Sequence, residues 1–427
     1  MGELREVTRS LVATALLAAV AACGSDEPTS PEPPGSLVVT PGRLVLGLGL
    51  SRQLVASVRD GAGEPVTDAT VSFVSSDPTI VAVTAEGLVS YVGVGQAEIT
   101  ATSDDLVDVI PYTGLRSGHP LGTTATSATL PGIVEGDGPF GAAVDGSGRI
   151  FITQTHGGRL ASASYPVMGF VTGELDGTPT SIALLGGGTA LVTPTGADND
   201  DASVIDLSTD RVLTQLTLDV PVFSAVTAPD SHTAYLGTND GRVLEFDVAS
   251  SRVTGSIDLG VEKSRANHLA LNRAGTLLYA SSFTSGTVSE IDLASKSVLR
   301  TFFVGGEPQG IAVSLDGAEL YVADESNTGS IDIYDLAEAT LSLSIPSGAT
   351  FGTGGPFGLA ISPDGASVYV GVITGDGPGL IQVIEAATHS IQHTLTSCGE
   401  IPRRIAFGYS GGLAVIADET GCVNFVE

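Results

Sequence analysis

The stretch "PQGIAVSLDGAELYVADESNTGSIDIYDL", Pro308 to Leu336, decides the fold, because its pattern recurs along most of the chain. A close copy, "PFGLAISPDGASVYVGVITGDGPGLIQVIEA", runs from Pro356 to Ala386. Each copy holds a strand of small residues, an Asp-Gly turn, an aromatic-aliphatic strand, a variable loop and a Val/Ile strand. The repeat length of about 40 to 45 residues is that of a four-stranded propeller blade. We therefore expect a β-propeller.

Weaker copies bring the number to seven, which predicts a seven-bladed propeller over residues 119–427; these copies start at Phe140, Pro179, Phe223, Asn267 and Arg403. The last copy ends after three strands. The earlier segment "TTATSATLPGI", Thr123 to Ile133, has the pattern of the missing outer strand. Pairing it with the C-terminal strands would close the ring and remove an exposed sheet edge.

The repeats resemble the YVTN-type β-propeller family, and "YVADESN" from Tyr321 is the nearest copy of its Tyr-Val-x-Asn core. In a propeller the strands converge near the axis, so small side chains should lie there and large ones between neighbouring blades. We expect one tyrosine of each better copy to be core rather than a stacking platform for bases; these are Tyr235, Tyr279, Tyr321 and Tyr369.

Composition agrees with an all-β chain of short strands and tight turns, since the 427 residues include 55 glycines and 22 prolines. The chain is long enough for two or three domains. It carries 48 Asp+Glu against 18 Lys+Arg, for a formal net charge of −30. Such a surface repels phosphate backbones, which argues against a nucleic-acid partner. We interpret the acidic charge as a contribution to solubility.

A second domain is predicted over residues 36–114, where apolar and polar residues alternate in short segments separated by turns. "VSFVSSDPTIVAVTAEGLVSYVGVGQAEITAT", from Val71, resembles the bacterial Ig-like group 2 domain, with Phe73 in place of a frequent tryptophan. We expect a turn at "SSDP" and a small β-sandwich core. The side chains expected to point inward are Leu88, Ile99 and Ala101. The resemblance implies a spacer or an adhesion module, and we favour the spacer.

The N-terminal segment predicts export. "SLVATALLAAVAA" is about 13 residues long, too short for a membrane-spanning helix and typical of a signal peptide. "VAAC", ending at Cys23, resembles the bacterial lipobox, which implies cleavage after residue 22 and attachment of fatty acids such as palmitate to Cys23. Residues 23–35 would form a flexible tether. Gly24 and Ser25 favour the outer membrane in a host with two membranes. The alternative is a buried helix with an incidental cysteine.

Two further cysteines, Cys398 and Cys422, remain once Cys23 is lipidated. An exported compartment is oxidising, so we expect them to form a disulfide rather than stay as free buried thiols. Closing this loop would contribute about 3 kcal/mol in the chain-entropy model.

A candidate ligand site lies on one face of the propeller. This face carries the loops that join strand four of one blade to strand one of the next, and the loops that join strands two and three within a blade. The residues placed on this face are His156, Asp198, Asp200, His268, Gln309, Asp324, Arg403, Arg404, Asp418 and Glu419. His268 and Arg404 stand out, because the other five copies have glycine or serine at the same place. We expect both to project into a glycine-lined funnel and to bind a carboxylate or a sugar acid. The alternative is that they fill a channel together with water.

No cofactor is required by the sequence. The acidic loop "GADNDDAS", Gly196 to Ser203, has oxygens of the kind that Ca²⁺ prefers but lacks EF-hand spacing, so a solvated loop is favoured over a calcium site. No metal-binding histidine spacing, nucleophile elbow or phosphate-binding loop is present.

These features predict a lipid-anchored, monomeric envelope protein whose propeller is a non-catalytic module binding a protein or carbohydrate ligand. A lactonase- or lyase-like enzyme with a site in the central funnel is the first alternative, because related propellers catalyse such reactions. A structural component of the envelope is the second.

Overall fold

The computed structural model describes residues 35–40, 44–46, 51–61, 64–93, 95–114, 125–129, 138–164, 171–175, 177–195, 201–260, 266–326, 329–349, 354–408 and 413–426. The predicted signal peptide, Cys23 and nearly all of the predicted tether lie outside these residues. The described chain is all-β, and its one helical element is a short 3-10 turn at Gly186–Gly188. No described residues form a helix that is long and apolar enough to cross a membrane.

Nine strands form the N-terminal unit, in sheets ordered β2-β9-β8-β5, β3-β7-β6 and β1-β4. They are β1 (Ser36–Thr40), β2 (Leu44–Leu46), β3 (Ser51–Gln53), β4 (Val55–Arg59), β5 (Ser72–Ser75), β6 (Val81–Val83), β7 (Leu88–Tyr91), β8 (Gly95–Ser103) and β9 (Leu106–Gly114). The sheets enclose one apolar core, with Ile99, Ile110 and Tyr112 at its centre. The predicted small sandwich is confirmed.

Local features of this unit follow the sequence with one exception. The "SSDP" turn is present: Asp77 N–H donates to Ser75 Oγ and Thr79 N–H donates to Asp77 Oδ1. Ile99 and Ala101 are fully buried, as expected, but Leu88 is 38% exposed and Val89 is buried in its place. The expectation for Leu88 was wrong because Gly87, at φ +81°, changes the direction of the chain just before β7, so the alternation starts one residue later.

The rest of the chain forms seven four-stranded antiparallel sheets, numbered here as blades one to seven. Blades one to three are β11 (Pro139–Val144), β12 (Arg149–Gln154), β13 (Arg159–Ser164), β14 (Val171–Glu174); β15 (Pro179–Leu184), β16 (Thr189–Pro194), β17 (Asp201–Asp206), β18 (Arg211–Thr217); and β19 (Val222–Thr227), β20 (Thr233–Thr238), β21 (Arg242–Asp247), β22 (Arg252–Asp258). Blades four to six are β23 (Ala266–Leu271), β24 (Leu277–Ser282), β25 (Thr287–Asp292), β26 (Ser297–Phe303); β27 (Pro308–Val313), β28 (Glu319–Asp324), β29 (Ser330–Asp335), β30 (Thr340–Pro346); and β31 (Pro356–Ile361), β32 (Ser367–Val372), β33 (Leu380–Glu385), β34 (Ser390–Thr396). Blade seven is β35 (Pro402–Phe407), β36 (Ala414–Asp418), β37 (Cys422–Val426) and β10 (Ala125–Thr129).

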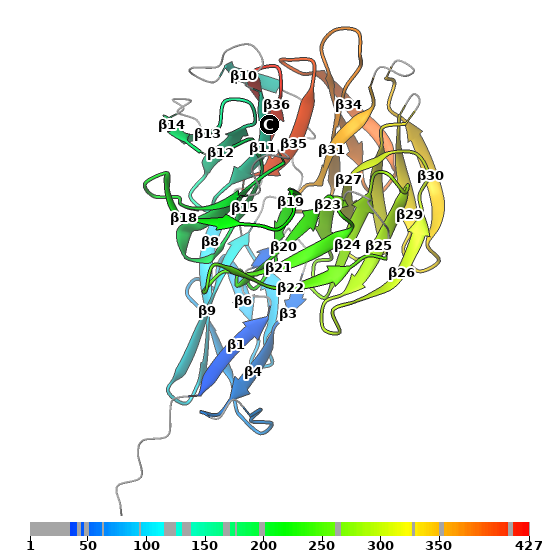
Figure 1. Cartoon of the computed structure of the whole chain (residues 1–427). Coiled ribbons are helices and arrows are strands. Elements are labelled where there is room, and N and C mark those ends of the chain that lie inside the picture. Colours follow the sequence, from blue (N-terminus) through cyan, green and yellow to red (C-terminus); the bar gives the residue numbers. More distant parts are fainter. Residues whose placement is uncertain are drawn as a thin grey trace, which may run out of the picture.

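The blades form a closed ring. The innermost strand of each blade contacts the innermost strand of the next, and β35 of blade seven contacts β11 of blade one. Blade seven takes its outer strand, β10, from the segment that precedes blade one, and β10 pairs antiparallel with β37. The predicted seven blades and the predicted closure by residues near Thr123 are both confirmed (Figure 1).

Large apolar side chains fill the spaces between blades. The four repeat tyrosines, Tyr235, Tyr279, Tyr321 and Tyr369, are buried, as predicted. Burial raises the pKa of Tyr235 and of Tyr279 to about 12, so both phenols stay neutral.

The Ig-like unit packs against the propeller face that carries the turns between strands one and two (Figure 1). Val109 of β9 lines a cavity of about 850 Å³ together with Ser147, Gly187 and Ser231 from these turns. Arg273, in the equivalent turn of blade four, has its pKa lowered by burial and by nearby Arg52 of the Ig-like unit. The opposite propeller face, which carries the predicted ligand site, is therefore left uncovered by the Ig-like unit.

Candidate functional site

The innermost strands position the residues that the sequence singled out. Each of these seven strands has a register shift within its first four residues, and His268 and Arg404 are both the third residue of their strand. A hydroxyl group fixes the backbone of His268 at this point: Ser281 Oγ accepts from His268 N–H at 3.1 Å and donates to the carbonyl of Gln309 at 2.9 Å. The site is thus built on strands rather than on loops.

His268 and Arg404 meet across the channel. Arg404 Nη1 lies 2.7 Å from His268 Nδ1, although their strands belong to blades seven and four. Arg404 Nη2 also donates to the carbonyl oxygen of Phe223 in blade three, at 3.3 Å. Blades this far apart in a ring of seven can touch only across the axis. The two residues therefore lie in the central channel.

The protonation of this pair follows from its geometry. A guanidinium group has only donors, so Nδ1 of His268 must accept and the imidazole proton is on Nε2. Burial, and then the charge of Arg404, lower the pKa of His268 well below its ordinary value of 6.5. Burial and the neighbouring Arg403 lower the pKa of Arg404 to about 9. At neutral pH the pair is a neutral imidazole beside a guanidinium cation.

Nε2 of His268 is a buried donor. The side chain is 4% exposed, and among the described residues Nε2 has no hydrogen-bond partner. A buried donor without an acceptor costs about 1–3 kcal/mol. A ligand or a water molecule that accepts from Nε2 would remove this cost.

Three phenylalanines surround the pair, and none of them was among the predicted site residues. The rings of Phe140 and Phe223 lie 6.2 Å apart and those of Phe140 and Phe357 lie 5.7 Å apart, edge to face. His268 contacts Phe357 edge to face at 5.7 Å. All three are the second residue of an innermost strand, and they come from blades one, three and six. Phenylalanine directly before glycine or serine in three copies was the signal, but it resembles ordinary core.

Arg403 lies next to this aromatic cluster. Its guanidinium carbon is 4.3 Å from the ring centre of Phe357 and 5.1 Å from that of Phe140, in cation–π contact. Glu419 holds it in place, because Arg403 Nε and Nη2 both lie 2.5 Å from Glu419 Oε2. We refer below to Phe140, Phe223, Phe357, His268, Arg403 and Arg404 as the channel cluster.

Gln309, another predicted site residue, borders the cluster rather than joining it. Its side-chain amide donates to Glu325 Oε2. Burial raises the pKa of Glu325, while Gln309 and Arg403 oppose this shift. Gln309 and Arg403 thus each hold a carboxylate beside the channel.

Two predicted site residues hold loops. Asp324 Oδ1 accepts from the N–H groups of Glu307 and Ser326 at 2.9 Å. Asp418, at the same place in blade seven, is fully buried; Ser397 Oγ donates to Oδ2, and Thr420 donates to Oδ1. Both carboxylates tie the loop entering a blade to the turn between its second and third strands. This gives them a role in the framework of the site.

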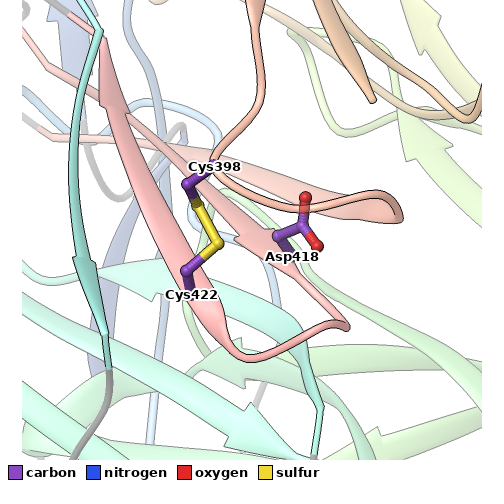
Figure 2. Close-up of side chains that lie close together, drawn as sticks. All are labelled: Cys398, Asp418 and Cys422. Carbon is purple, nitrogen blue, oxygen red and sulfur yellow. A yellow bond between two sulfur atoms is a disulfide. The ribbon is translucent and has the colours of Figure 1, made fainter. Parts of the chain in front are cut away.

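The disulfide expected between Cys398 and Cys422 is present and reinforces the same turn in blade seven (Figure 2). Asp418 lies beside it, and its carboxylate oxygen and the two sulfur atoms are within 4.8 Å of one another. Among the described residues this is the one group of metal-ligand type. The sulfur atoms are bonded to each other, so they offer no thiolates to a metal ion in this state.

The remaining predicted residues lie farther out or cannot be placed. His156 is exposed and lines a cavity of about 530 Å³ together with Glu400, Glu419 and Thr420. Glu419, which pairs with Arg403 of the channel cluster, thus lies beside the same cavity as His156. Asp198 and Asp200, and most of the acidic loop considered for calcium, lie outside the described residues.

The glycines at the third position lie close to the backbone of neighbouring innermost strands. A Cβ atom on Gly310 would lie 2.6 Å from the carbonyl oxygen of Phe357, and one on Gly141 would lie 2.7 Å from that of Thr180. On Gly358 it would overlap the carbonyl oxygen of Arg403. These glycines allow neighbouring innermost strands to approach each other. His268 and Arg404 interrupt this pattern and fill the channel instead.

Comparisons with known proteins agree with this architecture. Residues 36–113 match the family "bacterial Ig-like domain (group 2)". A structure of Kuenenia stuttgartiensis hydrazine synthase is similar, with a TM-score of 0.60 and 16% identity, over 70% of this chain and 99% of that one. At this identity the likeness shows the fold alone. A search of curated proteins gives no match. The chain thus contains a bacterial Ig-like domain of group 2, followed by a fold that it shares with a protein of very different sequence.

Proposed function

We propose that this protein is a binding module of the cell envelope, and that its propeller takes a small ligand at the channel cluster. The observation that carries the proposal is the contact between His268 and Arg404 across the ring, with the buried donor Nε2 of His268 beside it. A buried polar contact in which one donor lacks a partner is costly in a low-dielectric interior, and a bound acceptor would remove that cost.

Catalysis is the weaker candidate because the cluster lacks a poised base. The acceptor nitrogen of His268 is occupied by Arg404, and the low pKa of His268 makes it a poor proton acceptor. The carboxylates of Glu419 and Glu325 are engaged by Arg403 and Gln309. Binding asks only for oriented donors and cations, which the cluster offers.

We further propose that the protein is exported and anchored through a lipid on Cys23, that it acts as a monomer, and that the propeller belongs to the YVTN type. The signal-like segment before Cys23 supports the anchor. The Ig-like domain supports a spacer role, because it covers the propeller face opposite the channel cluster and β1 begins at its end remote from the propeller (Figure 1). An anchor preceding β1 would leave the channel cluster facing away from the membrane.

Ligand binding is tested on the full chain, purified in detergent, by screening sugars, sugar acids and short peptides for an increase in melting temperature and then measuring affinity by calorimetry. We expect a ligand whose binding is lost in the His268→Ala/Arg404→Ala double variant and kept in Lys296→Ala, on the outer part of the propeller. A ligand bound equally well by the double variant would place the site elsewhere. Circular dichroism checks that the double variant folds.

The anchor is tested separately by labelling cells with radioactive palmitate. The label should enter the wild-type chain and be absent from the Cys23→Ser variant, which should also leave the membrane fraction. Equal labelling of the two chains would rule out lipidation at Cys23.

A further inference from the structure

The chemistry of the ligand can be read from the groups that the channel cluster presents. Nε2–H of His268 is a donor at neutral pH, because Nδ1 is committed to Arg404. It is buried and has no partner among the described residues. The missing group is therefore a hydrogen-bond acceptor.

The same place is electropositive. Arg403 and Arg404 are consecutive, and the charge of Arg403 adds to burial in lowering the pKa of Arg404. This happens in a chain with 18 Lys+Arg and a formal charge of −30, in which cations are scarce. Two adjacent arginines in a desolvated channel favour an acceptor that carries negative charge, and the planar guanidinium matches a carboxylate.

The chain already places one carboxylate on this cluster. Glu419 pairs with Arg403, and both side chains are largely buried, 19% and 18% exposed. Arg403 in turn covers the faces of Phe357 and Phe140. A ligand that took the place of Glu419 would release Arg403 to bind it and would gain access to apolar ring faces.

We propose that the ligand of the channel cluster is a small organic carboxylate, bound by Arg403, Arg404 and Nε2–H of His268, and that Glu419 is an internal competitor for Arg403. This rests on the proposed binding function and specifies the ligand class. The carboxylate accepts the hydrogen bond that His268 lacks, and the body of the ligand packs against the phenylalanine rings.

Space for such a ligand adjoins the cluster on the uncovered face. A cavity of about 290 Å³ is lined by Phe223, Val222 and Pro221, and the carbonyl of Phe223 accepts from Arg404. The cavity of about 530 Å³ is lined by Glu419. The first cavity borders Phe223 of the cluster, and its volume is close to the lower limit of ligand pockets in proteins. The second borders Glu419, the partner of Arg403.

The experiment measures the affinity of the full chain for two acids with different bodies, glucuronate and benzoate, and for their neutral counterparts, glucose and benzamide. We expect at least one acid to bind more tightly than its neutral counterpart. Arg404→Gln should weaken that binding roughly 10- to 100-fold, as expected for loss of a charged hydrogen-bonding partner. His268→Phe, which lacks the donor, should weaken it by about tenfold, and His268→Gln, which keeps a donor, should weaken it less.

Glu419→Gln gives the sharpest result, because it should tighten binding by about threefold or more, whereas a merely structural role of Glu419 predicts weaker binding. Arg242→Gln is the matched control; this arginine pairs with Asp219 and Asp240, outside the channel, and its loss should leave the affinity unchanged. Melting temperatures of all variants show whether each folds.

The possible outcomes separate this inference from the proposed function. If a neutral compound binds through His268 and Arg404 while the acids do not, the binding function stands and the carboxylate class is wrong. If acids bind but Glu419→Gln weakens them, the competitor role is wrong. If no compound binds, both the carboxylate class and the channel site are rejected.

Discussion

Ala125 and Val426 lie opposite each other in blade seven, although Ala125 precedes blade one in the sequence and Val426 belongs to β37. All five residues of β10 pair in register with β37. The ring is therefore closed by backbone hydrogen bonds between segments about 300 residues apart, and its stability depends on a short outer strand.

Replacing Ala125–Thr129 by glycine and serine residues of equal number should lower the melting temperature and expose the edge of β37 to self-association. Differential scanning calorimetry and light scattering measure the two effects. The same replacement of the outer strand β22, which no ring closure depends on, is the comparison. An equal decrease in melting temperature in both variants would mean that β10 stabilises the propeller no more than an ordinary outer strand does.

The disulfide between Cys398 and Cys422 closes a loop with a sequence separation of 24. Its removal in the Cys398→Ser/Cys422→Ser double variant should lower the free energy of unfolding by about 3 kcal/mol, as the chain-entropy model expects for a loop of this length. Urea denaturation measures this value. A dithiol reductant should destabilise the wild-type chain by a similar amount and leave the double variant unchanged; destabilisation of both would point to another cause.

His268 makes stability depend on pH. Its folded-state pKa is far below 6.5, so below pH 6.5 the unfolded chain takes up a proton that the folded chain does not. The free energy of unfolding should therefore fall as the pH decreases through 6.5, by at most about 1.4 kcal/mol per pH unit from this group. The His268→Gln variant lacks this pH-dependent contribution. Relative to the wild type, its free energy of unfolding should therefore increase as the pH falls. A difference that stays constant from pH 7.5 to 5.5 would contradict the burial of a neutral imidazole.

Gly358 should tolerate no side chain, because a Cβ atom would overlap the carbonyl oxygen of Arg403 on the adjoining strand. Gly358→Ala is expected to cost about 1–3 kcal/mol, as overpacking does elsewhere, and to disturb Arg403 and Arg404. Ser224 occupies the same position in blade three and already carries a Cβ, so Ser224→Ala should cost less than about 1 kcal/mol. Equal effects in the two blades would show that the innermost strands do not approach closely at Gly358.

Much of the fold was readable from the sequence because propeller blades repeat. The copies from Pro308 and Pro356 fix the strand pattern, and the truncated last copy implies an outer strand from elsewhere, which is β10. Leu88 was predicted to face the core because inward and outward side chains were assumed to alternate from Leu88 onward. The left-handed conformation of Gly87 moves the first inward-facing residue to Val89. Turn geometry of this kind is hard to recognise from residue types alone.

The candidate site was readable only in part. His268 and Arg404 departed from the glycine and serine of the other copies, so the repeat itself singled them out. Their contact joins blades four and seven, and no periodicity predicts contacts across the axis. The phenylalanines escaped notice because an aromatic residue in an inner strand is usually core. Asp324 was predicted to lie on the ligand-binding face, yet its carboxylate accepts from the backbone N–H groups of Glu307 and Ser326.

The pairing of β10 with β37 in blade seven also sets an order of events during synthesis. β10 is made before blade one, but its partner β37 is made after the other six blades. The Ig-like domain can acquire its structure while the ribosome is still working, whereas the ring cannot close until β37 has emerged. Until then β10 lacks its pairing partner β37, and blade one lacks its neighbour blade seven. This delay keeps the propeller open until β37 has been made.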